Sequence, residues 1–227
     1  MTTVALMPMK AHSERVKGKN FRELLGRPLF GWMMETLLAV PAIDRVVINT
    51  DARELLARHG LVDHPRVLVR DRRSEICGDL VSMNRVLEDD IVSVPADIYL
   101  MTHTTNPLIS ADTVVRALDV YQAGVRERGM DSLFSVNRVQ SRFYRSDGSA
   151  VNHDPANLVR TQDLEPWFEE NSCLYVFSRD SFATTQARIG RRPILFETPR
   201  LESLDIDTQD DWNLVESVAR LHRQEVL

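Results

Sequence analysis

Short apolar segments alternate along this chain with longer segments whose apolar residues recur every three or four positions. The short runs have the length of buried strands, and they cover residues 4–9, 46–49, 67–69, 98–102 and 132–136. Between the first two runs the spacing is that of a helix packed on a sheet, with its inward positions at Leu29, Trp32, Met33, Thr36, Leu37 and Val40. Strands that alternate with helices predict an α/β fold around a mostly parallel sheet.

Later segments extend this architecture. One helix is expected to follow Ser110, and another to begin around Asp207. Between them lies a polar region with a turn-forming Ser-Asp-Gly sequence at 146–148. We therefore predict an inserted hairpin and loop at 138–170 within a single domain, 1–227.

The loops that follow the predicted strands are expected to line one crevice, because open parallel sheets bind ligands at the carboxyl ends of their strands. These loops begin after Met9, Asn49, Val69 and Thr102. Asp51, in the second of them, precedes Glu54 by three residues, which is the spacing of a helix N-terminal cap.

Composition narrows the classes of function. The chain has 227 residues and a net charge of -5, and no run of lysine and arginine indicates a nucleic-acid-binding protein. The first residues lack the basic and apolar regions of a signal peptide, and no window has the length of a membrane span, so we expect a cytoplasmic protein that acts on small molecules. Cys77 and Cys173 are expected to be buried apolar residues, and no histidine spacing matches a zinc site.

The loop after the first strand carries the first candidate chemistry. Residues 7–20 read Met-Pro-Met-Lys-Ala-His-Ser-Glu-Arg-Val-Lys-Gly-Lys-Asn. Lys10, Arg15 and Lys19 can neutralise phosphate oxygens, and the backbone N–H groups around Ser13 can donate hydrogen bonds to them. A solvated surface loop is the alternative, but the position directly after a strand favours a triphosphate site.

Two carboxylates near the other end of the chain, Asp205 and Asp207, are the second candidate. On an extended backbone, side chains two residues apart point to the same face. Carboxylates together with phosphates are typical Mg²⁺ ligands, so the pair predicts a Mg²⁺ site. Asp207 also precedes the last helix, where it is expected either to serve only as a cap or to combine both roles.

Together these two regions predict nucleotidyl transfer. An enzyme of this kind must orient the attacking oxygen and neutralise charge on the phosphates. We expect Lys10, Arg15, Lys19 and Asp207 to be the catalytic residues, which requires the opening loop and the acidic pair to lie together in the fold.

Five motifs occur in an order that resembles the CMP-sugar synthetases, specifically the acylneuraminate cytidylyltransferases. They are the opening segment, Gly-Arg-Pro-Leu at 26–29, Val-Ile-Asn-Thr-Asp at 47–51, Thr-Asn-Pro-Leu at 105–108 and Ser-Leu-Asp-Ile-Asp-Thr at 203–208. The resemblance implies a Rossmann-like mixed sheet with helices on both faces, of the nucleotide-diphospho-sugar transferase type. It also implies transfer of CMP from CTP to the anomeric hydroxyl of a nonulosonic acid, a small acidic sugar, with release of pyrophosphate. Such enzymes are homodimers in which the inserted loop closes a partner's site.

The resemblance also assigns residues to the two substrates. For CTP, the matching positions add Asn20, Arg72, Asp79 and Ser82 to the opening loop. Arg70 and Arg73 are adjacent alternatives to Arg72, and at least two members of the run 70–73 are expected to be exposed. For the sugar, the matching positions are His103, Thr105, Arg160, Gln162, Asn171 and Tyr175.

Several of these positions carry an alternative or a departure from the family pattern. His103 stands where the sialic acid enzymes usually have Gln, and the charge of a histidine can change near neutral pH. Core packing is the alternative for Tyr175. Lys10 and Ile109 stand where those enzymes usually have Arg.

These features leave three functions open. Thr105 with the following Asn stands where enzymes for the sugar acid Kdo have an acidic pair, which favours a nonulosonic acid. Transfer to another acceptor such as Kdo is the second hypothesis. A nucleotide-binding homologue that no longer catalyses is the third, because Lys10 and Ile109 depart from the pattern.

Overall fold

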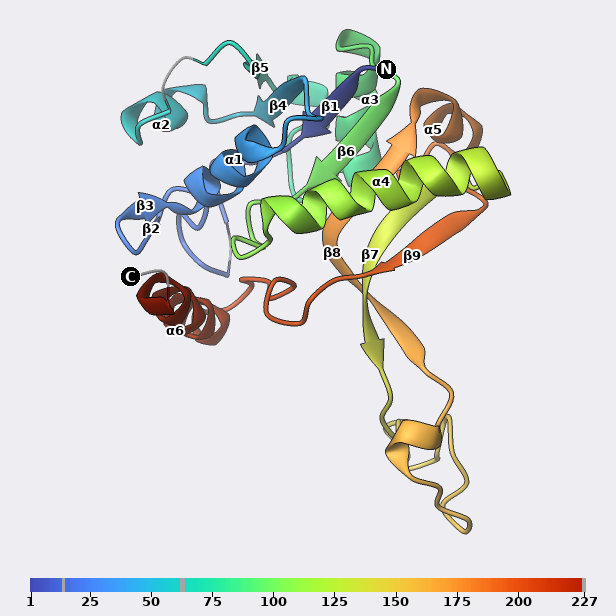
Figure 1. The fold of residues 1–227 in the computed structure, drawn as a ribbon. Helices are drawn as coiled ribbons and strands as arrows, with labels where there is room; N and C mark the ends of the chain where they lie inside the picture. Colours follow the sequence, from blue (N-terminus) through green and yellow to red (C-terminus); the bar gives the residue numbers. More distant parts are fainter. Residues whose placement is uncertain (14, 62–63, 226–227) are drawn as a thin grey trace.

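A single mixed sheet forms the centre of the computed structural model, which describes residues 1–13, 15–61 and 64–225 (Figure 1). Within these residues the sheet has seven strands in the order β5-β4-β1-β6-β8-β7-β9. The strands are β1 (Thr3–Leu6), β4 (Arg45–Thr50), β5 (Val67–Asp71), β6 (Ile98–Thr102), β7 (Ser132–Val139), β8 (Trp167–Ser178) and β9 (Pro193–Glu197). β1, β4, β5 and β6 run parallel, β8 is antiparallel to β6 and β7, and β9 is parallel to β7. A separate ribbon pairs β2 (Glu23–Leu24) with β3 (Arg27–Pro28).

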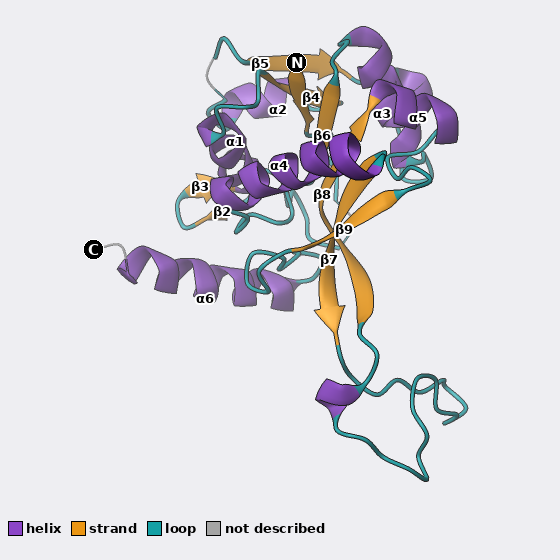
Figure 2. Cartoon of the chain, turned by 45° about the vertical axis from the view of Figure 1, so that its right-hand side comes forward, coloured by secondary structure: helices purple, strands orange, loops and turns teal. Residues whose placement is uncertain are grey.

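Helices cover both faces of the sheet, as predicted. One face packs against α1 (Leu29–Ala39), α2 (Arg53–Arg58) and α4 (Ala111–Arg128). The other packs against α3 (Met83–Ser93) and α5 (Arg179–Thr185). The last helix, α6 (Gln209–Glu225), lies apart from both layers, next to the β2–β3 ribbon (Figure 2). Among the described helices, none combines the length and the apolar composition needed to cross a bilayer.

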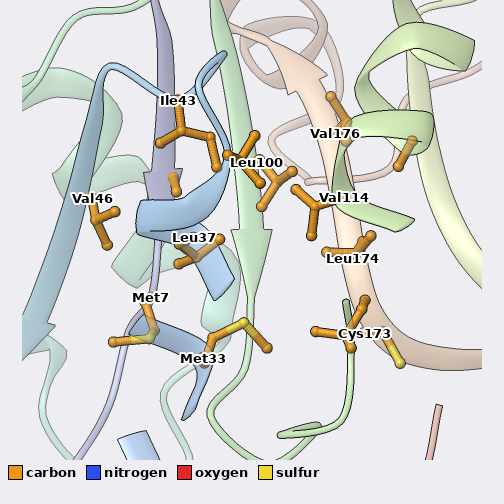
Figure 3. Close-up of a cluster of buried hydrophobic side chains, with 14 of the residues drawn as sticks. Met7, Met33, Leu37, Ile43, Val46, Leu100, Val114, Cys173, Leu174 and Val176 are labelled. Carbon is orange, nitrogen blue, oxygen red and sulfur yellow. The ribbon is translucent and has the colours of Figure 1, made fainter. Parts of the chain in front are cut away.

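The larger core lies between the sheet and α1 and α4 (Figure 3). Met33 and Leu37 from α1 and Val114 from α4 are fully buried there against Leu100 of β6. These positions carry the helical and strand periodicities of the sequence, so burial of apolar area explains both elements. Cys173 is buried in this core as expected, whereas Cys77 is only half-buried.

Two features differ from the sequence-based expectation. The regular part of the first strand ends at Leu6 instead of Met9, although Met7 and Met9 still donate backbone hydrogen bonds to Val47 and Asn49 of β4. The inserted region is an arm in which β7 and β8 continue as a hairpin beyond the body of the sheet (Figures 1 and 2). The short helix η2 (Thr161–Asp163) lies in this arm, and a second one, η1 (Ser74–Ile76), precedes α3.

Candidate active site

The opening loop is hydrogen-bonded to residues that follow β4 and β6, the two strands on either side of β1. Asp51, after β4, accepts a hydrogen bond from the Ala11 backbone N–H at 2.7 Å. Asn20 donates from Nδ2 to the Lys10 carbonyl at 2.9 Å, and its Oδ1 accepts from Thr104, after β6, at 2.6 Å. The expectation that Asp51 caps α2 is therefore wrong: the cap position is Ala52, which makes no side-chain cap bond, and the Asp51 carboxylate holds the loop instead.

The acidic segment near the end of the chain meets this loop. Asp207 pairs with Arg15 at 2.8 Å and with Lys19 at 3.3 Å. Lys19 is largely buried and also donates to the Ile206 carbonyl at 2.5 Å. Packing of α6 explains the approach, since Trp212 and Ile206 are buried against Val16 of the opening loop. The predicted juxtaposition of the two regions is confirmed.

Asp207 is not the cap of the last helix. Thr208 occupies that position, and its hydroxyl accepts from the Asp211 backbone N–H at 3.2 Å. The Asp211 carboxylate accepts in return from the Thr208 backbone N–H at 2.7 Å, which completes a capping box. The reading of Asp207 as a cap is therefore wrong, and its carboxylate is directed to Arg15 and Lys19.

Asp205 is an exposed residue two positions before Asp207, and its hydrogen-bond partner Thr105 lines the cleft described below. Surrounding protein atoms raise the pKa of its carboxyl above the usual range, and the negative charge of Asp207 adds to this effect. A hydrogen bond from Thr105 and the charge of Lys19 oppose the rise. Two carboxylates two residues apart have the donor chemistry that suits a divalent cation. Among the described residues no cluster of three or more His, Cys, Asp and Glu forms, so such an ion would need further ligands from a substrate.

A cleft of about 230 Å³ opens between the opening loop and the ends of β5 and β6. Its lining residues are Pro8, Met9, Lys10, His12, Ser13, Arg15, Lys19, Asn20, Arg72, Met83, Thr104 and Thr105. Most of the residues predicted for CTP are in this set. Asp79 is connected to it through an ion pair with Lys10, and Ser82 is the exposed residue directly before α3.

Arg72 is the member of its run that faces the cleft. Its Nε donates to Asn49 Oδ1 at 3.0 Å, and its Nη2 donates to the Asn49 carbonyl at 2.8 Å. Arg70 instead pairs with Asp89 and Asp90 of α3. The expectation that two members of the run are exposed is confirmed, at residues 71 and 73.

His103, just after β6, is held as a neutral imidazole. Burial lowers its pKa to about 4, and the positive charges of Arg188 and Lys19 act in the same direction. The expectation that its charge changes near neutral pH is therefore wrong. The imidazole remains available as a neutral donor or acceptor.

Tyr175 of β8 belongs to the core, where it is fully buried between the sheet and helices α3 and α5. Its hydroxyl reaches the edge of a polar cluster, where it donates to Glu170 and accepts from Arg188 at 3.0 Å. Burial raises the pKa of Tyr175 to about 12, and the hydrogen bond to Glu170 contributes. The sequence reasoning missed Glu170 and Arg188, because only the fold brings them to Tyr175.

Three of the predicted sugar residues lie outside this cluster. Asn171 donates to Asn137 of β7 at 3.0 Å and to Thr198, after β9, at 2.7 Å, so it ties the sheet together. Arg160 pairs with Asp163 at 2.7 Å, and the carbonyl of Gln162 accepts from a side chain of the same arm at 3.2 Å. The structure therefore places Arg160 and Gln162 on the projecting arm and not in the cleft of their own chain. Ile109 is a buried core residue next to α1.

This arrangement coincides with a known protein family. The family model described as Cytidylyltransferase matches residues 4–226. The chain belongs to the cytidylyltransferase family. The family resemblance read from the motifs is thus confirmed, and this cytidylyltransferase is an enzyme of the nucleotidyl-transferring class.

Two curated relatives align with this chain over different fractions of their own length. The CMP-N,N'-diacetyllegionaminic acid synthase of Legionella pneumophila is 24% identical over 240 residues, covering 99% of each chain. The N-acylneuraminate cytidylyltransferase of Oncorhynchus mykiss is 25% identical over 221 residues, which span 93% of this chain and 49% of the fish protein. This cytidylyltransferase therefore corresponds to about half of that longer protein.

A solved structure shows the same fold. It is a CMP:2-keto-3-deoxy-manno-octonic acid synthetase complexed with CTP, with a TM-score of 0.67 and 16% identity, covering 98% of this chain and 100% of that one. The likeness confirms the mixed α/β architecture predicted from the sequence.

Proposed function

We propose that this cytidylyltransferase transfers CMP from CTP to the anomeric hydroxyl of a nonulosonic acid and releases pyrophosphate. One observation carries the proposal: Asp207 pairs with Arg15 and Lys19, 192 and 188 residues away in sequence, beside the cleft. This contact brings phosphate-binding cations and a carboxylate pair to one place. The names of the full-length Legionella relative and of the fish relative support the acceptor class.

The residues of the cleft suit displacement at the α-phosphorus of CTP. Charge develops on the phosphoryl oxygens and on the departing pyrophosphate, and fixed cations stabilise it. Lys10, Arg15 and Lys19 line the cleft together, and His12 and Ser13 lie in the same lining. Arg72, fixed by Asn49, would hold the nucleoside portion.

We further propose that Asp205 and Asp207 hold Mg²⁺ together with triphosphate oxygens. The position of Asp205 two residues from Asp207 supports this assignment, since a cation between the two carboxylates would offset the desolvation and the charge of Asp207 that raise the pKa of Asp205. When bound, the ion would neutralise charge on the phosphates. Asp205→Ala is expected to abolish Mg²⁺-dependent turnover while leaving the far-ultraviolet circular dichroism unchanged, and Asp210→Ala, on the exposed start of α6, is the matched control. Retained turnover in the Asp205 variant would refute the assignment.

Pyrophosphate release from CTP and Mg²⁺, measured with a panel of sugar acids, tests the reaction. Release that depends on a nonulosonic acid supports the proposal. Release only with Kdo or another acceptor would show that the acceptor is not a nonulosonic acid. CTP binding without turnover for any acid would identify an inactive binding protein.

We propose in addition that the enzyme is a homodimer in which the arm, residues 138–170, reaches the partner's cleft. The arm extends beyond the sheet and carries the exposed side chains of Leu158, Trp167 and Phe168 (Figure 1). Light scattering should give the mass of a dimer. Mixed dimers of Arg160→Ala and Asp205→Ala subunits should regain activity, since one of their sites combines an intact arm with an intact cleft. A monomeric, active enzyme would contradict this arrangement.

A further inference from the structure

Arg188, in the loop after α5, is held in a fixed position by two residues of β8, Tyr175 and Glu170. Its guanidinium carbon lies 4.0 Å from the centroid of the Tyr175 ring, and its Nη2 donates to the Tyr175 hydroxyl at 3.0 Å. The same Nη2 lies 3.6 Å from Glu170 Oε1. Stacking, a hydrogen bond and an ion pair together fix the plane of the guanidinium.

The loop that carries Arg188 packs against the start of α3, which borders the cleft. The Arg188 backbone N–H donates to Asn84 at 3.3 Å, and the preceding residue, Met83, lines the cleft. The positive charges of Arg188 and Lys19 both lower the pKa of His103, the residue that directly precedes the cleft residues Thr104 and Thr105. Lys19 belongs to the phosphate-binding end, and Arg188 therefore adds a second cation on the side of α3 and β8.

The contacts of Arg188 leave part of its donor set for a ligand. Among the described residues, every recorded hydrogen bond of its guanidinium runs through Nη2, and the side chain keeps 21% of its surface exposed. Nε and Nη1 carry three further N–H donors. Glu170 balances the positive charge, so an anionic substituent would face a carboxylate at this position. A neutral carbonyl oxygen fits the remaining donors without that repulsion.

Building on the proposed function, we infer that Arg188 selects the acceptor by donating a hydrogen bond to the carbonyl oxygen of an acylamino substituent on the sugar acid. Tyr175 and Glu170 act as positioning residues for this donor. The role is distinct from phosphate binding, so it affects the use of the acceptor and leaves CTP binding unchanged.

The test uses two sugar acids that are identical except at one position, where one carries an acylamino group and the other a hydroxyl group. Both are assayed with CTP and Mg²⁺. Arg188→Met should lower kcat/KM for the acylamino acid by about 10- to 100-fold, the size of a hydrogen bond to a charged group, and change the value for the hydroxyl acid by less than about threefold. Arg188→Lys should lower kcat/KM for the acylamino sugar acid by less than Arg188→Met does, because lysine keeps the positive charge. Some loss remains, since lysine lacks the planar set of donors. Arg191→Met, at an exposed position of the same loop, is the control.

CTP affinity and thermal unfolding of each variant show whether the effect is confined to the acceptor. Equal losses on both acids, or a loss of CTP affinity in either Arg188 variant, would overturn the role of Arg188 while leaving the proposed function intact. A wild-type enzyme that turns over no nonulosonic acid would overturn the proposed function, and the Arg188 assignment with it.

Discussion

Asp90 of α3 is a buried carboxyl whose ionisation can be measured as stability. The residue is fully buried, its Oδ1 accepts from Asn49 Nδ2 at 2.8 Å, and it pairs with Arg70. Among the described residues, its Oδ2 has no hydrogen-bond partner. Burial raises the pKa of Asp90 from 3.8 to about 6, even though Asn49 and Arg70 oppose the rise. Asp90→Asn removes the titrating group and keeps the shape and the acceptor for Asn49.

The size of the effect follows from the two pKa values. The folded protein holds the Asp90 proton more tightly than the unfolded chain, so this group contributes its full stability below about pH 4 and loses it as the pH rises through 6. The change from 3.8 to about 6 corresponds to about 3 kcal/mol in the free energy of unfolding. The stability of Asp90→Asn relative to the wild type should therefore increase by about 3 kcal/mol between about pH 4 and pH 8.

Urea unfolding of both proteins across this pH range measures the difference directly. Asp119→Asn, at an exposed position of α4, controls for the loss of one negative charge. A difference between Asp90→Asn and the wild type that stays constant from pH 4 to pH 8 would show that the reasoning about Asp90 is wrong.

Three further predictions concern the site and its supports. Asn49→Asp should weaken CTP binding by at least about 10-fold in a calorimetric titration, because it places a second carboxylate against that of Asp90. Adding Asp90→Asn should restore most of the affinity. If the double variant recovers no affinity, the role of Asn49 in fixing Arg72 is contradicted. Thr208→Ala should cost about 1 kcal/mol in urea unfolding through loss of the capping box, whereas Thr208→Ser should retain most of it. Because the pKa of His103 is about 4, His103→Gln should not shift the dependence of kcat on pH between about pH 6 and pH 8. A shift of the acidic side of that profile would contradict a neutral His103.

The sequence was most informative where a local pattern corresponds to a local structure. The spacing of Met33 and Leu37 predicted a helix on the sheet, and both side chains are fully buried there. Ser110 was expected at the start of a helix, and it is the N-cap of α4. In contrast, β9 and α5 were not predicted. The β9 sequence Pro-Ile-Leu-Phe-Glu does not alternate apolar and polar residues although its burial alternates, and a helix of seven residues carries little periodicity.

The candidate site shows the same division. The opening loop and the acidic pair were recognised from residue types, and the requirement that they meet followed from the chemistry alone. Their contact depends on α6, whose Trp212 is buried against the β2–β3 ribbon and the opening loop. Nothing local to Asp207 specifies its pairing with Lys19, 188 residues away.

By itself, the sequence determined the alternation of strands and helices, the family and the residue types of the phosphate-binding loop, since these follow from periodicity and from motifs of neighbouring residues. Only the tertiary structure decided that Asp51 holds the opening loop, that Thr208 caps α6, and that Arg188 stacks on Tyr175. The physical reason is that a polar side chain has several partners of similar strength available, and packing of distant apolar segments selects which one comes within hydrogen-bond distance.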